Sequence, residues 1–204
     1  MDYTQQVEAV SRSVHKDVIT LANGKPARTI ILRQTLPAPA AELWDTVTKP
    51  ERLAVWFAPV SGDLRINGHY TITGNASGSV TECSPSDRFF ALSWEFGDTI
   101  SAVRVHLKEA EDGNGDGGSS KTTTLEIMHT FPIDSHWKKY GPGAGGPSSE
   151  DWAASREAAT FTERASERWR DAAIEGGEDD RWAREAGDRT TAFYVPGWEA
   201  KSTN

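Results

Sequence analysis

The stretch LPAPAAELWDTVTKPERLAVWFAPVSG, residues 36–62, determines how the rest of the chain is interpreted. Pro37 and Pro39 bias the residues before them toward extended backbone, and Pro50 has a φ angle suited to a first helical turn. Apolar residues recur at helical spacing after Pro39 and after Pro50. We therefore predict two short helices, over 41–48 and over 50–57.

Around this stretch the pattern changes to that of strands. Val103, Val105 and Leu107 alternate with polar or charged residues, so this strand has one apolar and one solvent-facing side. Further strands are predicted over 28–36, 69–73, 90–96 and 122–131, with another beginning at Val80. In the last of these strands His129 lies on the apolar side, with Leu125 and Ile127.

The C-terminal part of the chain is predicted to be helical. A connection rich in glycine and proline precedes a helix over about 150–175, whose apolar stripe is narrow and mostly alanine. Gly176 and Gly177 end this helix, and a last helix starts at Asp179 or Asp180.

The order of these elements is that of an α+β helix-grip fold, also described as START-like or Bet v 1-like. In such a fold a curved antiparallel sheet, with two short helices after strand 1, wraps a C-terminal helix around a cavity. We expect a lead-in over 1–26, a sheet domain over 27–146 and a helical segment over 147–204. A chain of 204 residues suits one domain with appendages. A binding cavity is therefore the first functional expectation.

Composition argues against several classes of partner. The net charge is −8, and no cluster of lysine or arginine offers a footprint for nucleic acid or an anionic membrane. No stretch approaches the roughly 18 apolar residues of a spanning helix, and the N-terminus lacks a secretion-signal pattern. The single cysteine, Cys83, cannot form an internal disulfide. We expect a cytoplasmic protein that binds neither nucleic acid nor membrane.

Several segments resemble the START-like superfamily, also called SRPBCC. The matching motifs are PAAELWD at 39–45, PERL at 50–53, NGHY at 67–70, TLEI at 124–127 and HT at 129–130. Within the superfamily they are similar to the C-terminal domain of the activator of the ninety-kilodalton heat-shock chaperone ATPase. The resemblance covers about residues 30–144 and implies the helix-grip fold. It implies no single function, because the superfamily includes ligand carriers, cyclases, hydroxylase subunits and chaperone partners.

The chain departs from the family pattern where the long gripped helix should follow the sheet. Gly146 is followed at once by Pro147-Ser148-Ser149-Glu150, so the expected helix is shortened or replaced. Either the alanine-rich helix over 150–175 lies across the sheet as a thinner substitute, or the groove stays open and a partner, such as the second copy in a homodimer, covers it. We favour the substitute, because uncovered apolar strands would form a larger patch than a monomer normally tolerates.

His129 is the main candidate for a polar group inside the predicted cavity, where it would orient a ligand or titrate near neutral pH. A hydrogen-bonded core histidine is the simpler alternative. Tyr70, Trp56 and Trp94 would line the same cavity, since aromatic rings supply area and the tyrosine hydroxyl a directional bond. For the tryptophans, core packing is the alternative. The predicted ligand-binding set also contains Ile72, Val105 and Ile127.

The sequence shows no catalytic set, and we expect no cofactor and no metal. The five histidines lack ligand spacing, and one cysteine cannot build a zinc knuckle. Residues 112–117 imitate the start of a calcium loop, but Thr123 stands where a bidentate glutamate is needed, so we expect a solvated hairpin loop. A nucleophile pair of Cys83 or a serine with a histidine lacks a nucleophile-elbow sequence.

Three hypotheses for the function follow. The first is a non-catalytic START-like domain that binds a small hydrophobic or aromatic molecule between sheet and helix. The second, implied by the resemblance, is an interaction module that contacts a chaperone ATPase and modulates it. The third is a cyclase-type enzyme, which would need an acid–base pair near the cavity.

Overall fold

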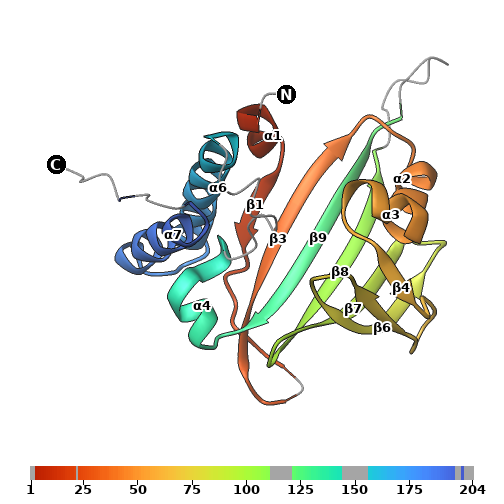
Figure 1. The fold of residues 1–204 in the computed structure, drawn as a ribbon, viewed down its shortest axis with the longest axis horizontal. Coiled ribbons are helices and arrows are strands. Elements are labelled where there is room, and N and C mark those ends of the chain that lie inside the picture. Colours follow the sequence, from red (N-terminus) through yellow and green to blue (C-terminus); the bar gives the residue numbers. More distant parts are fainter. Residues whose placement is uncertain (1–2, 22, 111–120, 144–155, 196–198, 200–204) are drawn as a thin grey trace. The chain divides into compact units, whose positions relative to one another are not determined.

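The computed structural model describes residues 3–21, 23–110, 121–143, 156–195 and 199. The chain divides into two compact units, one over Leu32–Phe131 and one that joins Met1–Ile31 to Pro132–Asn204. Within the described ranges nine strands form one sheet in the order β1-β3-β9-β8-β7-β6-β5-β4, and β2 pairs with β3 (Figure 1). Such a curved antiparallel sheet with helices confirms the predicted α+β helix-grip class.

The unit over Leu32–Phe131, called here the sheet unit, contains the two helices that the prolines predict. Its elements are the end of β3 (Pro26–Leu36), α2 (Ala40–Thr48), α3 (Pro50–Trp56), β4 (Val60–Gly62), β5 (His69–Ile72), β6 (Ser77–Ser84), β7 (Phe89–Phe96), β8 (Thr99–Glu109) and most of β9 (Thr123–Pro132). Both helices agree with prediction to within one residue at each end. Lys49 has extended backbone, and Pro50 takes the first position of α3.

One side of strands β5 to β9, called here the inner face, carries the predicted apolar residues. On β8, Ser101, Val103, Val105 and Leu107 are all buried, because residues two apart share a face. Antiparallel register brings inner-face residues of neighbouring strands together: Trp94 lies opposite Ser101, His129 opposite Val103, and Ile127 opposite Val105.

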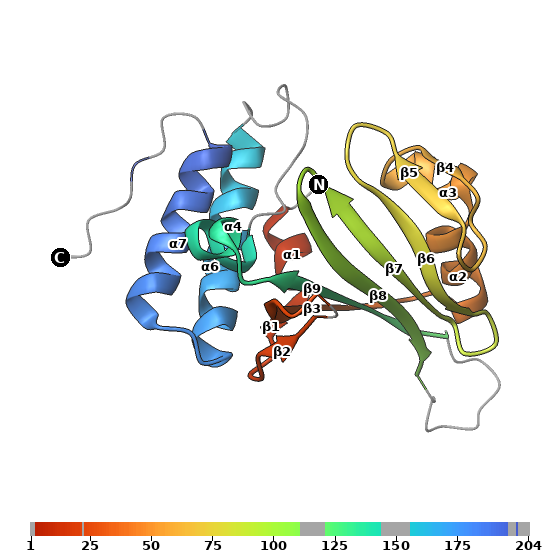
Figure 2. The same cartoon turned by 90° about the horizontal axis from the view of Figure 1, so that it is seen from below.

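Strand β6 pairs irregularly with β7, its neighbour in Figure 2. The register with β7 shifts between Val80 and Glu82, and such irregularities bend a strand. At Gly78 a Cβ atom would lie 2.1 Å from the carbonyl oxygen of Ser93, so a side chain cannot fit. Tyr70 lies opposite this glycine and reaches across it to β7, where its hydroxyl donates to that same carbonyl at 2.7 Å.

Helices α2 and α3 differ in how they meet the sheet. Trp44 of α2 packs edge-on against Phe90 of the inner face, with ring centroids 5.9 Å apart. Helix α3 contacts β4 and has no buried residue. Core packing, the alternative that the sequence offers for Trp56, is therefore wrong, since 53% of this residue is exposed.

The second unit, called here the helical unit, combines the two ends of the chain. Its elements are α1 (Tyr3–Glu8), β1 (Ser11–Val14), β2 (Ile19–Thr20), the start of β3, α4 (Ser135–Tyr140), η1 (Gly141–Gly143), α6 (Arg156–Glu175) and α7 (Asp180–Tyr194). Helices α6 and α7 lie side by side (Figure 2). Asp134 and Asp179 cap α4 and α7 by accepting hydrogen bonds from backbone N–H groups. The predicted start of the last helix is thus confirmed.

The small-residue face of α6 is used inside the helical unit. Thr162, Ser166, Ala172 and Ala173 are buried, and α6 packs against α1, β1, η1 and α7. Its alanine face is therefore engaged with neighbours of its own unit. The interpretation that the helix over 150–175 lies across the apolar strands as a substitute for the gripped helix stays a prediction, because those strands belong to the other unit. Residues 150–155 of that predicted helix lie outside the described ranges.

An ion pair joins the start of β3 to the connection between α6 and α7 within this unit. Nε of Arg28 lies 2.8 Å from Oε1 of Glu178, and the same guanidinium donates to the carbonyl oxygen of Lys16 at 2.6 Å.

The predicted boundaries at 26/27 and 146/147 stay a prediction. None of the helices in the described part of the chain combines the length and the apolar content that crossing a bilayer requires.

Candidate ligand-binding site

His129 lies among aromatic rings on the inner face. Its ring stacks on Phe131 with centroids 3.7 Å apart, and it meets Trp94 edge-on at 5.7 Å. Its Nε2 atom lies 2.8 Å from Oγ of Ser101. These four residues are called the histidine cluster from here on. Ser101 is buried, whereas the three rings are half-buried and keep accessible surface.

The charge state of the histidine cluster follows from burial. Desolvation lowers the pKa of His129 to about 3, because the apolar surroundings disfavour the charged imidazolium. The ring is therefore neutral at physiological pH. The prediction that His129 points with the apolar residues is confirmed by its register on β9, but the expectation that it titrates near neutral pH is wrong.

Three of the predicted residues lie deeper in the sheet unit. Tyr70, Ile72 and Val105 are buried, with 3%, 4% and 7% of their surface exposed. Burial, followed by the charge of Glu95, raises the pKa of Tyr70 to about 12. Its hydroxyl already donates its proton to the main-chain oxygen of Ser93, so that proton is not available for the predicted hydrogen bond to a ligand. These residues support the inner face from within.

The other predicted residues divide between two places. Ile127 is half-buried on β9, two residues from His129, and Trp94 belongs to the histidine cluster. Trp56 is on α3, 53% exposed, and its Nε1 donates to the carbonyl oxygen of Thr46 at 3.0 Å. The structure therefore gives no support to a shared cavity of Trp56 with Tyr70.

Sequence reasoning missed two members of the cluster, Ser101 and Phe131. The signal that identifies them is the alternation itself. Ser101 is two residues before Val103 on β8, and Phe131 is two residues after His129 on β9, so each continues the inner face of its strand.

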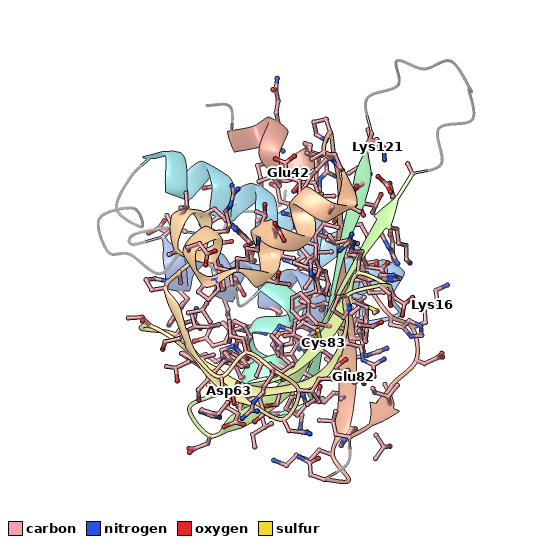
Figure 3. The ribbon with its side chains drawn as sticks, turned by 90° about the vertical axis from the view of Figure 1, so that its right-hand side faces the viewer. Lys16, Glu42, Asp63, Glu82, Cys83 and Lys121 are labelled. Carbon is pink, nitrogen blue, oxygen red and sulfur yellow. The ribbon has the colours of Figure 1, made fainter. Side chains whose placement is uncertain are left out.

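A separate groove of about 450 Å³ lies in the sheet unit where α2 begins. Figure 3 labels Lys121, which lines this groove, and Glu42 of α2. The lining residues are Pro39, Ala40, Ala41, Ser86, Asp87, Arg88, Leu107, Glu109 and Lys121. Its volume suits a small ligand, but charges of both signs line it and none of the seven predicted residues takes part. It does not match the predicted apolar cavity.

Other chemistry has little basis among the described residues. No group of three or more histidine, cysteine or acidic side chains there is placed to hold a metal ion. The predicted loop over 112–117 lies outside the described ranges. Thr123, the residue in the twelfth position of that motif, is buried and donates to the carbonyl oxygen of Ala38 at 2.8 Å. Cys83 is half-buried and free (Figure 3).

The fold and the apolar inner face define a helix-grip protein of the START-like, or SRPBCC, superfamily. The model of the family "Activator of Hsp90 ATPase homolog 1-like protein" matches residues 37–143, which is more than half of the chain. The chain belongs to this family. The resemblance found in the sequence is thereby confirmed.

Solved structures support the same fold. The crystal structure of CalU16 from Micromonospora echinospora is 27% identical, with 91% of this chain and 98% of that chain covered and a TM-score of 0.53. Its solution NMR structure is 29% identical, with 83% and 97% covered and a TM-score of 0.63. A norcoclaurine synthase mutant from Thalictrum flavum is 10% identical, and the match covers 60% of this chain and 83% of that chain. Its TM-score of 0.40 is too low to support an argument. No curated protein matches the chain.

Proposed function

We propose that this chain is a non-catalytic ligand-binding domain that holds a small hydrophobic or aromatic molecule at the histidine cluster. The observation that carries the proposal is a neutral histidine between Trp94 and Phe131 on a face whose rings keep accessible surface. The rings supply area for stacking, and the imidazole supplies a polar contact that orients the ligand. The helix-grip fold and the family match support a ligand-binding role.

The surroundings of the cluster favour an apolar ligand. Ile127 and Leu92 are half-buried inner-face residues, and Val103 and Val105 are buried on the strand between them. An aromatic molecule that covers about 100–200 Å² of apolar surface would gain about 2.5–5 kcal/mol. A simple probe is therefore expected to bind with a dissociation constant of about 0.2–15 mM.

Titration of the full chain with 2-naphthol, followed by backbone amide NMR, tests the proposal. We expect the shift changes to centre on Trp94, His129 and Phe131. The Trp94→Ala variant should weaken binding more than about tenfold, since it removes one of the two rings. The matched variant Trp56→Ala should bind as tightly as the wild type, because Trp56 lies on α3.

Two outcomes would overturn this placement of the ligand. One is a set of shift changes centred on the groove beside Lys121, and the other is an equal loss of affinity in the Trp94→Ala and Trp56→Ala variants. A native mass spectrum of protein purified from its own host would show any co-purified molecule and its mass, and it would also give the number of subunits.

A second candidate function is contact with a chaperone ATPase, which the family's name and the surface of α3 favour. Val55, Trp56 and Phe57, called here the α3 patch, have exposed fractions of 84%, 53% and 46%. Consecutive exposed apolar side chains of this size suit a protein partner. Pull-down of the ninety-kilodalton heat-shock chaperone and an ATPase assay test this function.

A matched pair of variants places the proposed chaperone contact. Val55→Asp should abolish binding, whereas Ile100→Asp, at an exposed position on β8, should leave it intact. Absence of binding at micromolar protein would remove this candidate.

A cyclase-type activity is the third alternative. The low pKa of His129 makes it a weak base at neutral pH, and turnover that survives His129→Gln and Tyr70→Phe would count against that alternative.

A further inference from the structure

Ser101 makes two polar contacts, one with a main-chain oxygen and one with the ring of His129. Its Oγ is 3.2 Å from the main-chain oxygen of Trp94 and 2.8 Å from Nε2 of His129. A carbonyl oxygen only accepts hydrogen bonds, and a serine hydroxyl has a single proton to donate. If the hydroxyl donates to Trp94, its lone pair must accept from His129, and that requires a proton on Nε2.

The other ring nitrogen of His129 is then left for a ligand. Nδ1 makes no hydrogen bond to a residue within the described ranges, and it is not among the fully buried polar atoms without a partner. The ring as a whole is half-buried. A neutral imidazole with its proton on Nε2 carries a lone pair on Nδ1, which accepts a hydrogen bond.

We infer that Ser101 holds His129 in the tautomer protonated on Nε2, and that the site therefore selects neutral aromatic molecules that carry a hydroxyl or N–H donor. This inference rests on the proposed ligand-binding function and names the ligand class. Ser101 is a positioning residue in this arrangement, because it acts on the ligand through the imidazole.

The same arrangement disfavours anionic ligands. A carboxylate or phenolate would direct its lone pairs at the lone pair of Nδ1. The low pKa of the ring keeps it from becoming a cation that would attract the anion. The charged residues next along the strands, Arg104 on β8 and Glu126 on β9, alternate with the inner-face residues and project from the other face.

The nitrogen chemical shifts of the His129 imidazole in the ligand-free wild type test the tautomer directly. We expect a protonated Nε2 and a pyridine-type Nδ1. The Ser101→Ala variant should lose this fixed pattern and show a mixture of tautomers, and Ser101→Thr, which keeps the hydroxyl, should restore it. A wild-type ring protonated on Nδ1 would overturn the inference whether or not any ligand binds.

Three matched probes test the ligand class: 2-naphthol, 2-methoxynaphthalene and 2-naphthoate. In the wild type 2-naphthol should bind about three- to tenfold more tightly than 2-methoxynaphthalene, the usual range for one hydrogen bond, and 2-naphthoate should bind most weakly. The His129→Leu variant should bind the first two probes equally. The Ser101→Ala variant should keep its affinity for 2-methoxynaphthalene and lose most of the preference for 2-naphthol.

These experiments distinguish ligand binding at the histidine cluster from selectivity for hydrogen-bond donors. If 2-naphthol and 2-methoxynaphthalene bind equally well at the cluster, ligand binding stands and the selectivity inference fails. If neither binds there, the proposed function fails as well, and the imidazole spectrum still decides the tautomer. Circular dichroism of each variant excludes loss of fold as the cause of a change.

Discussion

The histidine cluster and the α3 patch are two aromatic regions of the sheet unit, and they differ in burial and in whether a polar ring atom remains available for a hydrogen bond. In the cluster, Trp94, His129 and Phe131 pack ring to ring and are half-buried. On α3, Trp56 is exposed and its indole N–H is already bonded to the main chain. A half-buried ring group with an available nitrogen suits a small molecule, whereas an exposed apolar surface with its polar atom satisfied suits a protein partner.

The largest difference between the two regions should appear in the free energy of unfolding when one valine in each region is replaced by aspartate. Val103→Asp introduces a carboxylate at a position on the inner face that is 7% exposed and lies opposite the neutral ring of His129. We expect a loss of more than about 4 kcal/mol in the free energy of unfolding. Val55→Asp, at 84% exposure, should cost less than about 1 kcal/mol.

Urea unfolding of both variants, followed by circular dichroism, measures this difference. A variant too unstable to purify would itself agree with the prediction for Val103. If the two variants lose similar stability, the inner face is more accessible than its burial indicates, and the contrast between the two regions fails.

Much of the fold could be predicted because its signals are local. Pro39, Pro50 and the period-2 alternation of β8 fix the elements through backbone sterics and burial of one face. The role of α6 could not be predicted in this way. An alanine stripe at helical spacing says that one side of a helix is packed, but its partner is decided by long-range contacts, here with α1, β1 and α7.

The candidate site was predictable in part for the same reason. Alternation along β9 places His129 on the inner face, and the same alternation places Phe131, two residues later, on that face as well. The bond from Ser101 depends on register between β8 and β9, which a single sequence does not reveal. Trp56 misled because helical spacing predicts which residues share a face and gives no measure of whether that face is covered.

A smaller effect is expected from acid, because the cluster contains a histidine whose pKa is strongly lowered by burial. The pKa of His129 is about 3 in the folded state and about 6.5 in an unfolded chain. Between these values the unfolded state binds more protons, so stability falls as pH falls. From pH 7 to pH 5 we expect a loss of about 2 kcal/mol from this group.

The His129→Gln variant should show a flatter dependence of unfolding free energy on pH between 7 and 5, whatever its absolute stability. Glu126 contributes little to the pH dependence of stability between pH 7 and pH 5. Burial acts to raise the pKa of Glu126, but hydrogen bonds and charges from Arg33 and Lys108 lower it overall, so its contribution is lost only in more acidic solution. Equal slopes for the variant and the wild type would show that the folded state does not desolvate the ring enough to lower its pKa.

The smallest expected effect compares one hydrogen bond beneath the inner face with one on α3. Tyr70→Phe removes the hydroxyl that donates to Ser93, leaving the rest of the buried ring in place, and should cost about 1–2 kcal/mol of unfolding free energy. Trp56→Phe removes the N–H that donates to Thr46 at an exposed position, where water replaces the lost partner, and should cost less than about 0.5 kcal/mol. Urea unfolding at neutral pH resolves this difference. A larger loss for Trp56→Phe than for Tyr70→Phe would mean that α3 is more firmly packed than its exposure indicates, and it would weaken the assignment of the α3 patch to a partner.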